Sequence, residues 1–189
     1  MLIEREQRIK KAQSSYLFVE REQGKQKKAQ SKSAPQKRGV FRGIIVIVYD
    51  FVYLSKQFYT DYALCTEIEQ KESRPHIRLL IWQEGLCFAV PLRSHITNPY
   101  AYLTDKTNLC GIDFSKAVLI TDEQKYIDRS QTPRIRQHEY NAMKGKEKVI
   151  ERGMVKYLAA YRKARTNPTA AHNSALLKYS TLKYFDSNL

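Results

Sequence analysis

The sequence is poor in the residues that mark metal sites, disulfide frameworks and nucleotide-binding loops. Its three cysteines stand far apart, at positions 65, 87 and 110, with no CxxC pair and no histidine at ligand spacing. This pattern argues against a zinc site or a disulfide framework and favours a reducing, cytoplasmic environment. None of the seven glycines builds a phosphate-cradling loop. Paired carboxylates and closely spaced histidines are also lacking, so we expect no metal and no other cofactor.

Long apolar runs are missing as well. The run Ile44–Val48 lies far from the N-terminus and stops before Asp50. It falls well short of the roughly 20 residues that a membrane span requires. We therefore expect neither a secretory signal nor a membrane partner. The density of Ile and Val predicts a buried strand or an extended segment that leads into one.

Positive charge, by contrast, is abundant. The 189 residues include 33 Lys and Arg against 19 Asp and Glu, a formal net charge of +14. An excess of this size indicates a polyanionic partner, because basic groups that neutralise phosphates release counterions. The 13 tyrosines and 7 phenylalanines supply rings that can either stack on unpaired bases or fill a core.

The charge is spread unevenly along the chain. Residues 1–42 hold 12 Lys and Arg and 4 Asp and Glu, a net of +8. The part from 23 to 38 is rich in Gln, Lys and Ser and nearly free of large apolar residues, which predicts a disordered basic arm. An extended translation start is the alternative explanation of this arm. Residues 43–189 are sufficient for one compact domain.

The pattern within residues 43–189 predicts an α+β fold, a small curled antiparallel sheet with helices to one side. The expected strands are 51–54, 76–82, 86–92 and 117–120, with a hairpin turn at 83–85. The expected helices run from the cap Ser55 to about Leu64, over 147–165, and from a cap at Asn173 or Ser174 onward. The polar stretch 97–110 is expected to be a surface loop.

Two short segments combine strand character with reactive groups. Pro91–His95 (PLRSH) places a cation, a hydroxyl and an imidazole on consecutive residues, and Gly111–Ala117 (GIDFSKA) adds Lys116. Cleavage of RNA by transesterification requires a base near the 2′-hydroxyl, cations for the phosphorane charge and a donor for the leaving oxygen. Arg93 can clamp a phosphate through its planar fork and His95 can serve as base or acid. Ser94 can donate to a phosphate oxygen, but no G-x-S-x-G elbow makes it a nucleophile.

In this order, the hairpin and the two segments resemble the toxins of type III toxin–antitoxin systems, the ToxN/AbiQ/CptN/TenpN endoribonucleases, with the TenpN branch the most similar. The resemblance covers about residues 51–189. It implies an SH3-like barrel of MazF/Kid type with helical elaborations. It also implies a metal-independent endoribonuclease that leaves a 2′,3′-cyclic phosphate and a 5′-hydroxyl. The implied partners are a repeat-encoded pseudoknot antitoxin RNA, in a cyclic protein–RNA assembly, and a cellular or phage target RNA, which would give a role in phage defence.

The resemblance also assigns site residues by position. Ser94 matches the serine of the family's Thr-Ser-Pro-Lys segment, whereas Arg93 stands at the threonine and Ile96 at the lysine. His76, which follows a proline, stands where the family has a lysine at the start of the hairpin. These departures leave open whether His95, His76 or Arg93 supplies the acid and the base.

Other residues are expected to contact RNA from outside the strand end. They are Lys116, Arg74, Tyr100, Tyr102, Arg134 and Arg136. Core filling for the tyrosines and a solvated surface for the cations are the competing interpretations. Asp113 is expected to cap or orient a neighbour, and Glu67, Glu69 and Glu72 to form a solvated acidic face. The alternative function is a non-catalytic module that binds RNA or DNA.

Overall fold

The computed structural model describes residues 49–69 and 76–189. Contacts divide the chain into two units, Met1–Asp50 and Phe51–Leu189, and every element described below belongs to the second. Four sequence-based predictions lie outside the described residues: the basic arm over 1–42, the strand over 44–48, the RNA contact of Arg74 and the exposed acidic position of Glu72.

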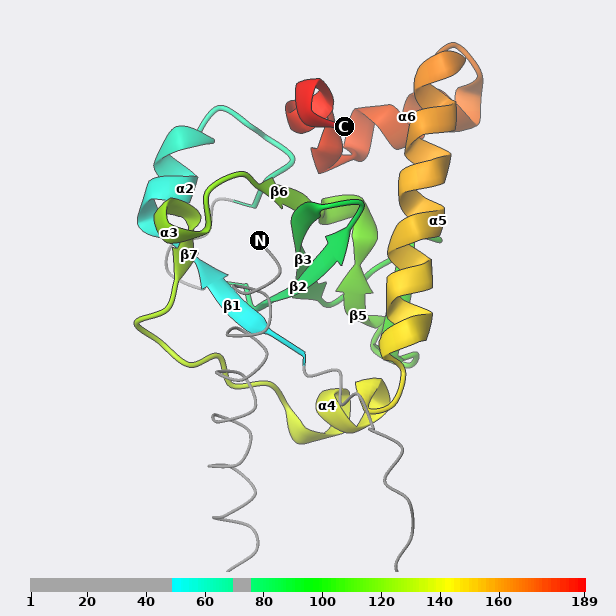
Figure 1. The fold of residues 1–189 in the computed structure, drawn as a ribbon. Coiled ribbons are helices and arrows are strands. Elements are labelled where there is room, and N and C mark those ends of the chain that lie inside the picture. Colours follow the sequence, from blue (N-terminus) through cyan, green and yellow to red (C-terminus); the bar gives the residue numbers. More distant parts are fainter. Residues whose placement is uncertain (1–48, 70–75) are drawn as a thin grey trace, which may run out of the picture. The chain divides into compact units, whose positions relative to one another are not determined.

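The second unit is an α+β fold built on a seven-stranded sheet, as predicted (Figure 1). The strands follow the order β4-β5-β3-β2-β1-β7, and β6 also pairs with β3. Every pairing among the described strands is antiparallel. The strands are β1 (Phe51–Leu54), β2 (Arg78–Gln83), β3 (Leu86–Arg93), β4 (Ala101–Asp105), β5 (Cys110–Asp113), β6 (Val118–Ile120) and β7 (Ile127–Asp128). The path ends at β4 and β7, so these strands do not close into a barrel.

Helices contact both ends of the sheet and also its interior strand β2. The α-helices are α2 (Lys56–Asp61), α3 (Glu123–Tyr126), α4 (Gln137–Met143), α5 (Glu147–Thr166) and α6 (Ala171–Tyr179). Two 3-10 segments, η1 (Phe114–Lys116) and η2 (Thr181–Asn188), complete the unit. Helices α2 and α3 contact each other near β1 and β7, whereas α4 and α5 contact β4 (Figure 1). Among the described helices, none has both the length and the apolar character needed to cross a lipid bilayer.

The predicted hairpin is confirmed, and its turn explains its register. Strands β2 and β3 pair from Arg78 opposite Pro91 to Gln83 opposite Leu86, which leaves a two-residue loop. Both loop residues have positive φ, 53° at Glu84 and 79° at Gly85. Turns of this kind match the right-handed twist of the flanking strands.

Strand β3 changes partners at Pro91, and this change creates the segment that carries the candidate site. On the edge away from β2, residues Cys87–Ala89 pair with β6, whereas Leu92 and Arg93 pair with β5. The amide of Leu92 donates to Ile77 on the β2 side, so the nitrogen of Pro91 faces the opposite edge. None of the described strands pairs with that edge at Pro91, and a residue without an N–H is therefore tolerated. The chain bridges β5 and β6 through η1 at this point.

Two of the predicted elements are wrong. The expected loop over 97–110 instead contains β4, a four-residue turn and the start of β5. All five residues of β4 are only half-buried. This edge strand therefore lacks the alternation of buried and exposed positions by which a strand is predicted from sequence. Its neighbour Gly111 is needed because a Cβ there would lie 2.1 Å from the carbonyl oxygen of Tyr102. The last α-helix begins after Ala170, which makes no side-chain cap bond, so the predicted cap at Asn173 or Ser174 is wrong. The side-chain amide of Asn173 donates to the Asn167 carbonyl instead.

Helix α5 confirms the predicted helix over 147–165 and fixes η1 in place. Its buried residues follow the predicted helical spacing and include Ile150, Met154, Tyr157, Leu158 and Tyr161. Gly153 lies on this helix beside the Phe114 ring of η1, and a Cβ at Gly153 would approach the ring to 2.6 Å. The missing side chain therefore allows helix and site segment to pack in contact.

We expect Gly153→Ala to destabilise the protein by about 1–3 kcal/mol, because the added methyl overpacks the Phe114 ring. Alanine is the better helix former by about 1 kcal/mol, so the same substitution should become neutral or stabilising in a Phe114→Leu background. Urea unfolding of the two single variants and the double variant measures this coupling. Equal effects of Gly153→Ala in both backgrounds would show that the ring and the helix are not in contact.

Candidate functional site

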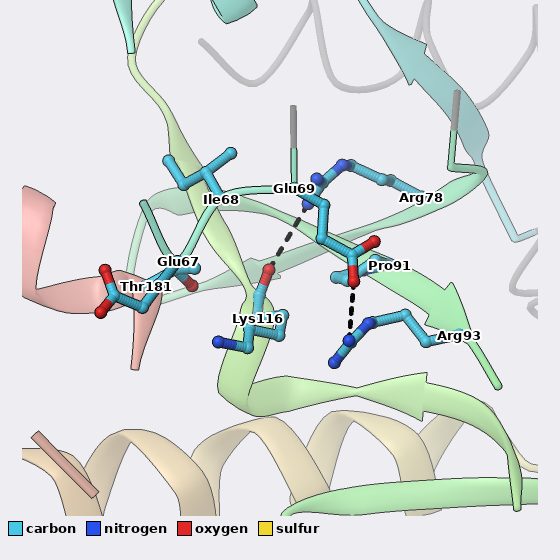
Figure 2. A pocket seen from close by; sticks show the side chains of 8 residues that line it. All are labelled: Glu67, Ile68, Glu69, Arg78, Pro91, Arg93, Lys116 and Thr181. Carbon is cyan, nitrogen blue, oxygen red and sulfur yellow. Dashed lines mark hydrogen bonds and ion pairs between the residues drawn. The ribbon is translucent and has the colours of Figure 1, made fainter. Parts of the chain in front are cut away.

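A small, shallow pocket that opens to solvent lies beside the end of β3. Figure 2 shows side chains from several elements directed toward it. Its lining residues are Glu67, Ile68, Glu69, Arg78, Pro91, Arg93, Lys116 and Thr181. Three of them are cations that come from β2, β3 and η1, segments that the sheet topology brings together.

The carboxylate of Asp113 organises this end of the pocket. Its side chain is fully buried, and Arg93 Nη1 donates to it over 2.6 Å. Its other oxygen accepts from the amide and the hydroxyl of Ser115 and from the amide group of Asn98, at 3.0, 2.6 and 3.2 Å. A buried carboxylate is stable only when it is paired and hydrogen-bonded in this way. The prediction that Asp113 caps or orients a neighbour is confirmed.

Arg93 lies between two carboxylates. Its Nη2 donates to Glu69 over 2.7 Å, while Nη1 is held by Asp113. Glu69 also pairs through its other oxygen with Nε2 of His76. The side chains of Arg93, Glu69 and His76 are each about one-quarter to one-third exposed, so this chain of contacts reaches solvent. The structure thus connects two predicted site residues, Arg93 and His76, through a carboxylate.

Arg78 is the deepest cation of the pocket. It is 2% exposed, and its Nη1 makes long hydrogen bonds of 3.4 Å to the carbonyls of Ala89 and Lys116. Its Nε has no hydrogen-bond partner, and no described carboxylate lies within ion-pair distance. Burial lowers the pKa of Arg78, although the Tyr59 side chain opposes that effect. The charge of Glu69 opposes it as well, but Arg78 forms no ion pair with any described residue, and an incoming anion would stabilise this buried cation further.

Lys116 is the second cation without a carboxylate partner. Its Nζ donates to the carbonyl of Tyr179 over 2.8 Å and forms no ion pair with any described residue. Burial, followed by the nearby charge of Arg93, lowers the pKa of Lys116 from its ordinary value of 10.5. The charges of Asp113, Glu67 and Glu69 oppose this shift without forming an ion pair with Lys116, so its ammonium group can still pair with an incoming anion.

The acidic residues before this site are not the solvated face that the sequence suggests. Glu67 forms an ion pair of 2.7 Å with Lys183 and accepts a hydrogen bond from the hydroxyl of Tyr184, while Glu69 binds Arg93 and His76. That prediction is wrong for both residues, because each is held by cations of the folded unit. Glu72 lies outside the described residues.

Ser94 and His95 lie just beyond the paired end of β3 and are exposed. Nδ1 of His95 and Oγ of Ser94 are 3.1 Å apart. His95 has a φ of 56°, a left-handed conformation that a non-glycine residue adopts at some cost. The chain turns there and returns to the core at Ile96, whose amide donates to the carbonyl of Leu109.

The remaining predicted RNA contacts lie away from the pocket. The Tyr102 hydroxyl donates to the Ala142 carbonyl over 2.7 Å, which ties β4 to α4. The Tyr100 hydroxyl lies 3.2 Å from Nε2 of His172, and its ring packs 5.2 Å from that of Tyr157. These bonds support the structural interpretation of both tyrosines, without testing whether they contact RNA. Arg134 and Arg136 are exposed on the segment that leads into α4.

Sequence reasoning missed Arg78 and Glu69. The signal for Arg78 is a single arginine inside the apolar stretch from Ile77 to Ile81, where a solvent-facing position is improbable. Glu69 gives no comparable signal, because its partners Arg93 and His76 come from distant parts of the sequence. No group of three or more His, Cys, Asp or Glu residues is arranged to hold a metal ion in the part of the chain that the structure describes.

Comparisons with known proteins leave this site to be interpreted from its own geometry. A scan against protein-family models and searches of curated proteins and solved structures found no match. The chemistry of the pocket therefore rests on its three cations, its paired carboxylates and the imidazole of His76.

The ion pair of Glu67 predicts an acid-dependent loss of stability. Hydrogen bonds from Lys183 and then from Tyr184 lower the pKa of Glu67 from 4.5 to about 2. A folded pKa below the ordinary value stabilises the fold above that ordinary value, and the effect is lost as the pH falls through the lowered one. Wild type should therefore exceed Glu67→Gln in unfolding free energy at neutral pH, with the difference shrinking between about pH 5 and pH 2.

Urea unfolding across this pH range measures the difference, with Glu151→Gln, an exposed carboxyl on α5, as control. A Glu67→Gln effect of the same size at every pH would contradict the assignment of the pair.

Proposed function

We propose that this chain is a metal-independent endoribonuclease that acts as the toxin of a type III toxin–antitoxin system. The observation that carries the proposal is the convergence of Arg78, Arg93 and Lys116 on one pocket, where two of the three cations form no ion pair with a described carboxylate. A phosphodiester is the anion that such a site suits on a chain with a formal net charge of +14. The resemblance of the PLRSH and GIDFSKA segments to the toxin family supports the same activity.

The pocket can supply the groups that transesterification requires. A base removes the proton of the 2′-hydroxyl, the 2′-oxygen attacks phosphorus, and the bond to the 5′-oxygen breaks as that oxygen takes a proton. Lys116 and Arg93 would stabilise the charge that builds on the phosphorane. Glu69 now occupies Nη2 of Arg93, so a phosphate oxygen would replace or share that carboxylate. The products would be a 2′,3′-cyclic phosphate and a 5′-hydroxyl.

His76 is the better placed of the two candidate histidines. It pairs with Glu69, which lines the pocket and binds Arg93. A carboxylate in this position fixes the orientation of an imidazole and stabilises its charged form. His95 is exposed and contacts Ser94. We therefore assign the general base or acid to His76.

Further elements of the proposal come from the resemblance alone. They are a sheet of SH3-like barrel type, a small pseudoknot RNA as inhibitor, a cyclic protein–RNA assembly, and growth arrest or phage defence as the outcome. The non-catalytic nucleic-acid-binding module is the alternative, and cleavage assays distinguish it from the enzyme.

Purified full-length protein should cleave single-stranded RNA in the presence of EDTA, and its expression should arrest bacterial growth. Lys116→Gln should slow single-turnover cleavage by about 100-fold, the usual effect of removing one group that stabilises transition-state charge. Lys106→Gln, an exposed lysine in the β4–β5 turn, is the matched control and should leave the rate unchanged.

RNA binding without cleavage by the wild type would favour the non-catalytic module. Cleavage that requires a divalent cation would overturn the metal-independent mechanism. Equal rates for Lys116→Gln and Lys106→Gln would show that the pocket is not the site.

The two histidines should differ in their effect on the reaction. His76→Gln should reduce single-turnover cleavage by about 100-fold and flatten the pH–rate profile in the range where imidazoles titrate, because it removes a positioned acid or base. His95→Gln should reduce the rate by less than about tenfold, because its imidazole is not linked to Glu69 and Arg93. Circular dichroism is used to check that both variants are folded. The opposite order of effects would assign catalysis to His95.

A further inference from the structure

The net positive charge of residues 43–189 comes from one part of this range. Residues 134–165, which contain α4 and α5, hold ten Lys and Arg and three Asp and Glu, a net of +7. Residues 43–133 and 166–189 together hold eleven Lys and Arg and twelve Asp and Glu, a net of −1. The need for solubility does not explain this segregation, since it would be met equally well by dispersed charges.

Four cations of α5 form a stripe on its outward side. They are Lys148, Arg152, Lys156 and Lys163, and all four are exposed. Successive helical residues are about 100° apart, so these four lie within about 80° of one another around the axis, opposite the buried face. The stripe extends about 22 Å along the helix at 1.5 Å per residue. Figure 1 shows α5 as the long helix that runs from α4 to α6.

The stripe differs from the other cations of α5 in having no ion-pair partners. Arg162 pairs with Glu84 at the β2–β3 turn over 2.7 Å, and Arg165 lies 3.5 Å from Asp186 of η2. None of the four stripe residues forms an ion pair with a described residue, and the polar bond within the stripe is from Arg152 Nε to the Lys148 carbonyl. Lys148, Arg152 and Lys156 follow one another at intervals of four, where like charges destabilise a helix by a few tenths of a kcal/mol per pair.

We infer that this stripe, Lys148-Arg152-Lys156-Lys163, binds the phosphate backbone of a single RNA strand. Cations spaced along a line match a linear polyanion, and contacts of this kind position a strand without reading its sequence. Helix α5 packs through Gly153 on Phe114, which lies between Asp113 and Lys116, so the stripe and the pocket are carried by elements in direct contact. The identity of the ligand rests on the proposed function, with the stripe holding RNA beyond the cleaved bond.

The test compares two variants that each lose three positive charges. One is Lys148→Gln/Arg152→Gln/Lys156→Gln, and the control is Lys56→Gln/Lys106→Gln/Lys178→Gln, whose three lysines are exposed elsewhere on the unit. The probe is a single-stranded 2′-O-methyl oligonucleotide, which binds but cannot be cleaved through its 2′-oxygen. Affinity of the full-length proteins is measured by fluorescence anisotropy at several salt concentrations.

The stripe variant should bind the probe about tenfold or more weakly, and its plot of log affinity against log salt should be shallower by about 2, since about 0.7 is lost per phosphate contact. The control variant should keep the affinity and the salt slope of the wild type. Cleavage by the stripe variant at saturating RNA should match the wild type, because the pocket is intact.

Equal affinities and salt slopes for the two variants would overturn the inference. It would also be overturned if the stripe variant lost binding to anionic vesicles, measured in parallel, while its affinity for the oligonucleotide did not change. The result remains informative if the wild type cleaves no RNA, because the probe measures binding alone. In that case the enzymatic proposal fails, and the stripe is judged by the affinity difference.

Discussion

The candidate site depends on the buried carboxylate of Asp113. A charge removed from water must be compensated in full, and this one accepts hydrogen bonds from Arg93, Ser115 and Asn98. These contacts hold the guanidinium of Arg93 at the end of β3. They also cap the start of η1, the 3-10 segment that contains Lys116. Other residues of the GIDFSKA segment are constrained by their packing. Gly111 permits the approach of β4, and Phe114 packs on α5.

The chemistry of the pocket follows from which of its charges are paired. Arg93 is held by Asp113 and Glu69, so it is oriented, and its charge is already balanced by these two carboxylates. Arg78 and Lys116 form no ion pair with a described carboxylate, although Glu69 lies near both, and their partly dry surroundings strengthen their interaction with an anion. Glu69 connects this cationic centre to His76. Rigid cations next to an oriented imidazole are what phosphodiester transesterification needs.

The sequence alone predicts those parts of the fold whose signals are local. The β2–β3 hairpin and α5 follow from turn chemistry and apolar periodicity, and the cap at Ser55 is confirmed by its bond to the amide of Phe58. Strand β4 is missed because an edge strand of half-buried residues resembles a polar loop. The site is only partly predictable for a different reason. Arg93 and Lys116 stand beside apolar strands, whereas the role of Glu69 arises from tertiary pairing.

The most direct test of this account is a crystal structure of the full chain with a 2′-O-methyl RNA that spans its mapped cleavage site. The quantity to measure is the distance from the scissile phosphate oxygens to Nζ of Lys116 and to the guanidinium of Arg93. We predict hydrogen-bond distances of about 2.7–3.2 Å to both groups, with the 2′-oxygen facing His76. A scissile phosphate bound elsewhere on the chain, with Glu69 still paired to Arg93, would contradict it.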